Sequence, residues 1–334
     1  MNARLPLIAL LAALMALPAC TTNKTTGRLQ FNSLSREEEI KLGTEAAPQL
    51  TAEFGGKVPD EALQQYVTDL GRRLAETTGV DDPTLPSLPW EFTLLNSDVI
   101  NAFALPGGKV FISRALAEQM TDEAQMAAVL GHEIGHVTAE HADERMGQQY
   151  GLVLGGTILG AVLGGVAGRD TESAGIGAAA GATVGSIAAL SYSRNQEIEA
   201  DRLGMRYMER IKYDPSAALD VQEILKRESE KSGARQPEIL STHPASDTRI
   251  RDLRKRLDKY YQHTFNNPEY VRNAERYQQQ FLSRLRTLPP PQRTTLNTDG
   301  RPRTSLLAAS FFADPTTWCG HCAAASREAD AAER

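Results

Sequence analysis

The sequence HEIGH at residues 132–136 comes just after the apolar run AAVL at residues 127–130, and this segment is the most informative part of the sequence. Two histidines four residues apart on a helix differ by about 400° in rotation, so His132 and His136 share one face. Both imidazoles can therefore reach one metal ion. Glu133 stands beside them, where its carboxylate can hold a metal-bound water and take its proton. The apolar run predicts a buried helix, which is an unfavourable place for two histidines without a partner.

A third protein ligand is needed, and an acidic block further along the chain offers one. Zinc suits imidazole and carboxylate ligands that leave a tetrahedral position open for water, whose pKa it lowers from about 15.7 towards 7. His141 is rotated about 140° from the face of the two histidines, so we expect a supporting role for it and no metal contact. In EIEAD at residues 197–201, Glu197 and Asp201 share a face. Glu197 can bind the metal while Asp201 accepts the outer N–H of a ligand histidine; a solvated acidic helix face is the alternative.

Around this site the hydrophobic spacing predicts one α+β domain, predominantly helical, over residues 36–288. Expected helices lie at residues 36–50, 61–76, 121–140, 196–210, 216–230 and 248–261, with Thr121 as an N-cap, and expected strands lie at 90–95 and 109–113. We interpret Val110 to Ile112 as an edge or near-edge strand, to which an extended peptide can add by backbone hydrogen bonds. An ordinary core strand is the alternative.

Composition excludes several classes of protein. The chain has 334 residues, of which 41% are hydrophobic, and this excludes a wholly disordered protein. Its 42 acidic residues outnumber 36 basic residues, which argues against a nucleic-acid partner. Three cysteines are too few for a disulfide scaffold.

The amino terminus has the pattern of a targeting segment. An apolar run of thirteen residues follows the basic Met1–Arg4 and predicts a signal peptide at 1–19. LPAC at 17–20 resembles the lipobox of bacterial lipoproteins, which implies lipidation of Cys20; ordinary cleavage near Ala19 is the alternative. The resemblance implies a lipid-anchored protein on the periplasmic face of the envelope. Because Thr21 follows the cysteine, where inner-membrane lipoproteins often have Asp, the outer membrane is favoured. Residues 20–35 are polar, and we expect a loose lipidated tether.

Four blocks, in order, resemble the HtpX and CAAX prenyl-protease family of gluzincin metallopeptidases, and its periplasmic lipoprotein members in particular. They are NAFALPGG at 101–108, HEIGH at 132–136, EIEAD at 197–201, and STHP at 241–244 followed by Arg249. The resemblance implies a zincin-like domain with a small β-sheet and an active-site helix. It also implies a zinc-dependent endopeptidase that acts in protein quality control on misfolded or unassembled envelope proteins by metal-activated water attack.

The resemblance assigns roles to five of these residues. It implies one zinc ion per chain held by His132, His136 and Glu197, with Glu133 as the general base. It places His243 near the metal, where the histidine either stabilises the oxyanion or occupies the open metal position; a histidine at a helix entry, without such a role, is the alternative. The rival function is a membrane-tethered assembly or chaperone-like module with a latent metal site.

Two further segments carry separate predictions. Residues 146–193 are rich in glycine, and we expect a helical hairpin or lid that covers the site or rests on the bilayer surface; membrane insertion is the alternative. Residues 289–334 read as a disordered tail. Its Cys319-Gly-His-Cys322 resembles a thioredoxin motif only locally, because no room remains for that fold, so a tail disulfide or an adventitious metal site is favoured.

Overall fold

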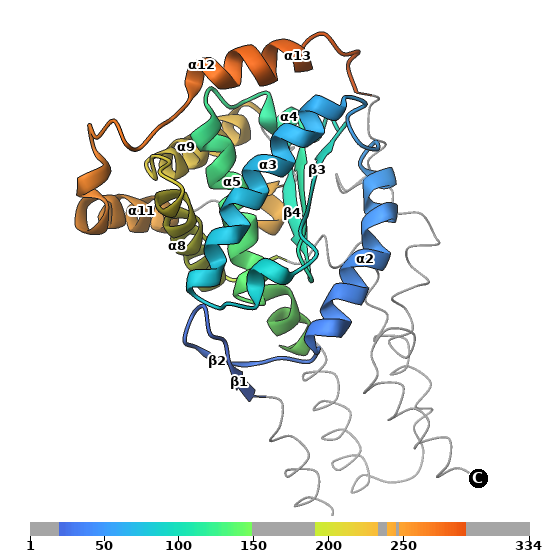
Figure 1. Cartoon of the computed structure of the whole chain (residues 1–334), viewed down its shortest axis with the longest axis vertical. Helices are drawn as coiled ribbons and strands as arrows, with labels where there is room; N and C mark the ends of the chain where they lie inside the picture. Colours follow the sequence, from blue (N-terminus) through green and yellow to red (C-terminus); the bar gives the residue numbers. More distant parts are fainter. Residues whose placement is uncertain (1–19, 149–190, 233–238, 245–246, 292–334) are drawn as a thin grey trace, which may run out of the picture.

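The computed structural model describes residues 20–148, 191–232, 239–244 and 247–291, and in that part of the chain helices dominate a small sheet (Figure 1). The α+β prediction is therefore confirmed. The predicted signal peptide, the body of the glycine-rich hairpin and the tail with Cys319 and Cys322 lie outside the described residues.

The main elements follow the predicted ones closely. The helices are α2 (Arg36–Glu53), α3 (Glu61–Thr77), α4 (Arg114–Ala117), α5 (Glu123–Thr138), α8 (Arg194–Arg210), α9 (Ala217–Ser232), α10 (Ile239–Thr242), α11 (Asp247–Tyr260), α12 (Ala274–Arg276) and α13 (Ser283–Leu285). A helix at residues 141–148 follows α5. The strands are β1 (Cys20–Thr22), β2 (Leu29–Phe31), β3 (Glu91–Leu95), β4 (Ala102–Leu105) and β5 (Lys109–Ser113). Among the described helices, none combines the length and the apolar character needed to cross a membrane.

The central sheet has the strand order β3-β5-β4. β5 pairs in parallel with β3 and antiparallel with β4, to which the turn at Pro106–Gly108 connects it. Val110 to Ile112 therefore lie in the central strand, next to an edge and not at one, and because this strand is paired on both sides it offers no open edge to a peptide. The unpredicted strand β4 occupies the other side of β5 and is itself the edge.

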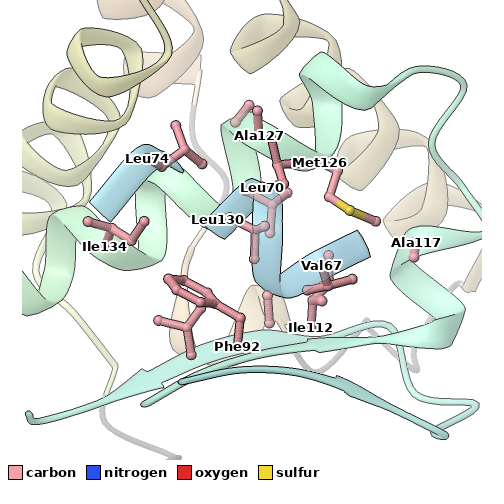
Figure 2. Packing of buried hydrophobic residues seen from close by; sticks show 14 of the residues in the cluster. Val67, Leu70, Leu74, Phe92, Ile112, Ala117, Met126, Ala127, Leu130 and Ile134 are labelled. Carbon is pink, nitrogen blue, oxygen red and sulfur yellow. The ribbon is translucent and has the colours of Figure 1, made fainter. Parts of the chain in front are cut away.

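The core lies between the sheet and two helices, α3 and α5 (Figure 2). Leu70 and Leu74 of α3 face Leu130 of α5 above Phe92 and Ile112 of the sheet, and each of these side chains is at most 3% exposed. Because α5 is packed on its apolar side, its histidines are held at a fixed height above the sheet.

The start of α5 differs by one residue from the prediction. Asp122 is the N-cap and accepts a hydrogen bond of 3.0 Å from the Gln125 backbone N–H. Thr121 is not the cap, because its own backbone N–H donates to the Gln125 side chain at 2.8 Å. A carboxylate at this position also interacts favourably with the helix dipole.

Helices α5 and α8 approach each other closely through glycines. A Cβ on Gly204 of α8 would lie 2.9 Å from the His132 backbone nitrogen, and a Cβ on Gly135 of α5 would lie 2.9 Å from the Ala200 carbonyl oxygen. Distances this short exclude any side chain. The glycines therefore let α8 bring its acidic residues within reach of the histidines on α5.

The segment before α2 is a hairpin, so the prediction of a loose tether at residues 20–35 is wrong. β1 and β2 pair antiparallel and lie at the end of the molecule away from α12 and α13 (Figure 1). Asn23, Thr25 and Gln30 are buried. Asn23 and Gln30 hydrogen-bond to the domain, so part of the polar character of this segment serves these contacts.

Candidate metal centre

Four ligand groups converge from three places in the fold. His132 and His136 come from α5, Glu197 from the first turn of α8, and His243 from the turn after α10. Their ligand atoms all lie within 4.8 Å of one another. The Nε2 atoms of His132 and His136 are 3.0 Å apart, and Glu197 Oε1 lies 3.3 Å from His136 Nε2. The structure thus brings together the residues that the sequence placed at the site.

Each histidine on α5 is also held on its outer side. His132 Nδ1 lies 2.9 Å from Asp201 Oδ1, which is the contact predicted for Asp201. His136 Nδ1 lies 3.0 Å from Nδ1 of His141, the residue expected to support the site without ligating. A proton on each outer Nδ1 leaves the lone pair of each Nε2 directed at the centre.

This arrangement fits a divalent cation. Two imidazole lone pairs and a carboxylate oxygen point at one buried location, and they would repel one another without a positive charge between them. Glu133 Oε2 is buried and has no hydrogen-bond partner among the described residues, so it is open to a water or a substrate group. Nitrogen and carboxylate donors in this number are the set that zinc prefers.

Arg249 of α11 balances the charge behind the ligands. Burial disfavours ionisation of Glu197, but the Arg249 guanidinium and the neighbouring histidines together hold the pKa of Glu197 well below its ordinary value. Burial acts in the same direction on Asp201, but the Arg249 guanidinium and the hydrogen bond with His132 together lower the pKa of that carboxyl. Both groups are therefore anionic at neutral pH, as a ligand and its orienting partner must be.

Protonation differs among the other three groups. Burial lowers the pKa of His136 well below its ordinary value. Burial acts in the same direction on His132, but hydrogen bonds with Asp201 and Glu197 outweigh it and raise the pKa of His132 to about 10. Burial raises the pKa of Glu133, although the nearby histidines oppose the shift. A cation at this site therefore competes with a proton on His132.

His243 and one unpredicted residue close the remaining side. His243 Nδ1 lies 2.9 Å from Glu197 Oε1, and its Nε2 lies 3.6 Å from Glu133 Oε1. Tyr192 stacks on the His136 ring with centroids 4.0 Å apart, and its backbone N–H donates to the Thr242 carbonyl. A single tyrosine beside a glycine-rich stretch gives no sequence signal, so only the structure identifies it.

A pocket of about 30 Å³ opens beside the general-base candidate, which is room for about one water molecule. His132, Glu133 and His243 line its polar side. Apolar side chains form much of the remaining wall, among them Val129, Val221, Leu225 and Ile239. The pocket therefore places a water-sized space against Glu133 and an apolar surface next to it.

The comparisons with known proteins agree with this geometry. The sequence profile of peptidase family M48 matches residues 61–257, which include His132, His136, Glu197 and His243. The beta-barrel assembly-enhancing protease of Escherichia coli is 32% identical over 261 residues, 77% of this chain and 50% of that protein. The protein of the same name from Yersinia pestis is 34% identical over 259 residues, with 76% and 51% covered.

A more distant relative is the mitochondrial metalloendopeptidase OMA1 of Schizosaccharomyces pombe. It is 28% identical over 234 residues, 70% of this chain and 65% of that protein. The chain spans about half the length of the two bacterial relatives. Since the profile covers more than half of the chain and contains the whole ligand cluster, the chain belongs to peptidase family M48.

Proposed function

We propose that the chain is a zinc-dependent endopeptidase of the bacterial cell envelope that degrades misfolded or unassembled proteins. The observation that carries the proposal is the position of Glu133 beside the ligand cluster and the water-sized pocket, where its Oε2 has no hydrogen-bond partner in the described part of the chain. Membership of peptidase family M48 supports a peptidase. Within that family, the four sequence blocks favour the HtpX and CAAX prenyl-protease group.

In this proposal His132, His136 and Glu197 hold the zinc, and Asp201 orients His132. When bound, zinc lowers the pKa of a water and polarises the substrate carbonyl. Glu133 accepts the proton of that water and delivers it to the amine that leaves. Burial raises the pKa of the Glu133 carboxyl, which makes it a better proton acceptor than an exposed glutamate.

A second candidate is the assembly or chaperone-like module with a latent metal site. The position of His243 favours it: Nδ1 lies 3.3 Å from His132 Nε2 and 2.9 Å from Glu197 Oε1, where it would make a fourth ligand. A site with four protein ligands has no open position for water. If the chain is an endopeptidase, His243 either moves aside or stabilises the oxyanion.

The location and substrates extend the same proposal. Signal cleavage after residues 1–19 and lipidation of Cys20 would anchor the domain at 36–288 to the periplasmic face, with the outer membrane favoured. The names of the bacterial relatives, beta-barrel assembly-enhancing proteases, support an envelope role. Residues 146–193 would act as a lid or rest on the bilayer, and residues 289–334 would be a tail without a catalytic part.

The decisive experiment compares cleavage of casein, an unfolded substrate, by the wild type and Glu133→Gln. We expect the variant to bind one zinc per chain and to cleave at least about 1000-fold more slowly, because the proton acceptor is gone while the ligands remain. The matched control is Glu91→Gln, a half-exposed glutamate on β3 that pairs with Lys57 at 3.3 Å. Equal cleavage by the wild type and Glu133→Gln contradicts the enzyme proposal.

His243→Ala separates the two candidates. If His243 blocks the site, the alanine variant cleaves casein faster than the wild type, and a latent site becomes active. If His243 stabilises the transition state, activity falls while the zinc content stays at one per chain. Zinc content is measured by metal analysis of the same samples.

A further inference from the structure

A chain of polar contacts runs from the His136 ring to the N-terminal hairpin, which we define as residues 20–31. His136 Nδ1 lies 3.0 Å from His141 Nδ1, and His141 Nε2 lies 3.1 Å from Glu199 Oε2. Arg28, in the loop between β1 and β2, donates from Nε to Glu199 Oε2 at 2.9 Å. His141 is fully buried, so this series of polar contacts runs through the interior of the protein.

The contacts determine which ring nitrogen of each histidine carries the proton. His136 Nε2 must keep its lone pair to serve as a ligand, so the His136 proton is on Nδ1 and is donated to His141 Nδ1. His141 then carries its own proton on Nε2 and donates it to Glu199. Glu199 accepts from both His141 and Arg28, so the guanidinium holds the carboxylate that fixes the His141 tautomer.

Arg28 joins two helices at this point. Its Nη2 lies 3.1 Å from Glu144 Oε2 on the helix at residues 141–148, while its Nε reaches Glu199 on α8. Gln196 also donates to Glu144 at 2.9 Å. Without the guanidinium, two partly buried carboxylates would repel each other, and Glu199 would lose the contact that keeps it beside His141.

The N-terminal hairpin also completes the end of α5. Asn23 Nδ2 donates to the Thr138 carbonyl at 3.0 Å, and Gln30 Nε2 donates to the Ala139 carbonyl at 3.3 Å. Carbonyls in the last turn of a helix have no partner within the helix. Since His136 stands in that last turn, the same hairpin fixes both the backbone and the outer ring nitrogen of one ligand.

We propose that the N-terminal hairpin is part of the metal centre, with Arg28, Glu199 and His141 as positioning residues that hold His136 Nε2 towards the metal. Zinc affinity then depends on a segment that begins at Cys20, about a hundred residues before the ligands. The inference rests on the proposed zinc site and adds to it a set of residues that touch neither metal nor substrate.

The test measures the zinc affinity of the full chain by competition with a chromophoric chelator. We expect Arg28→Ala and Glu199→Gln each to bind zinc about 10-fold more weakly than the wild type, the low end of the effect of residues that orient metal ligands. Arg28→Lys should recover part of the loss. The matched control is Lys24→Ala, because Lys24 lies in the same hairpin but pairs with Asp82, with its side chain 65% exposed.

The unfolding temperatures of the zinc-free proteins distinguish residues that position a metal ligand from residues that only stabilise the fold. Unchanged zinc affinity in Arg28→Ala overturns the inference, even if the zinc-free variant unfolds at a lower temperature. An equal loss in Lys24→Ala also overturns it, because the hairpin would then act only through general stability. If the wild type binds no zinc, the proposed function itself is contradicted. If the wild type and Arg28→Ala both bind zinc normally, only this inference is contradicted.

Discussion

Arg249 Nη1 lies 2.6 Å from Glu197 Oε2, and the same guanidinium donates to both oxygens of Asp201 at 2.6 and 2.7 Å. The Arg249 side chain is 3% exposed, so these contacts are shielded from water. One residue of α11 therefore holds both the carboxylate that we propose as a metal ligand and the carboxylate that contacts His132. The contact explains how two buried acids on one face of α8 stay ionised next to each other.

Replacing Arg249 by alanine should destabilise the zinc-free protein by about 3–5 kcal/mol, because two buried carboxylates lose their counter-ion. Denaturant unfolding of the zinc-free protein measures the change. Arg251→Ala is the control, since Arg251 is exposed on the same helix and donates to the Thr248 hydroxyl, which carries no charge. Equal stability of the two variants would show that the Arg249 guanidinium does not stabilise the two buried carboxylates.

Replacing Asp201 by alanine should weaken zinc binding about 10- to 100-fold, because His132 loses the acceptor that fixes its ring and tautomer. Chelator competition measures the zinc affinity, and the affinity of Asp201→Asn should lie between those of Asp201→Ala and the wild type. Asp252→Ala serves as the control, because Asp252 pairs with the exposed Arg202 away from the ligands. Affinity within twofold of the wild type in Asp201→Ala would rule out this orienting role.

Side chains at Gly204 should force α5 and α8 apart. A Cβ there meets the His132 backbone nitrogen at 2.9 Å, so we expect Gly204→Ala to lose about 1–3 kcal/mol of unfolding free energy and Gly204→Val more. Zinc affinity should fall in the same order, because Glu197 moves with α8. If both variants keep the wild-type stability and affinity, the helices do not need this close approach.

The stability of the protein should fall as the pH rises, through the buried Glu39 of α2. Burial raises the pKa of Glu39 from 4.5 to about 8; Arg36 opposes the shift, while Glu140 and Asp143 add to it. Between these pH values the folded state binds more protons than the unfolded state, so the Glu39 contribution is complete below pH 4.5 and is lost as the pH rises through about 8.

Glu39→Gln should therefore flatten the dependence of unfolding free energy on pH over that window, by an amount on the order of 4 kcal/mol. Denaturant titrations at several pH values between 5 and 8.5 would measure it. The control is Glu37→Gln, which changes an exposed residue on the same helix turn. Parallel curves for the wild type and Glu39→Gln would contradict the assignment.

The helices and the ligand spacing could be predicted from the sequence because both depend on local periodicity. α5 and α8 lie within a few residues of their predicted ranges, and the helical repeat alone places His132 beside His136. β4 gave no such signal. All four of its side chains are buried, so the alternation that marks a half-exposed strand is absent.

The contacts around the ligands could be predicted only in part. Asp201 was found because it shares a helix face with Glu197, whereas Arg28 contacts Glu199 across 171 positions of sequence. The N-terminal hairpin was missed for the same reason. Its polar side chains look like those of a tether, and only their partners on other elements show that they are ordered.

The order of these residues along the chain determines when the centre can form during synthesis. Chains emerge from the ribosome amino end first, so the hairpin and the histidines of α5 are made well before α8. Arg249 is the last to appear, and until it does, the carboxylates of Glu197 and Asp201 lack their counter-ion. A nascent chain therefore lacks part of the centre until α11 has been made, so the proposed peptidase would be inactive until the rest of the domain can fold.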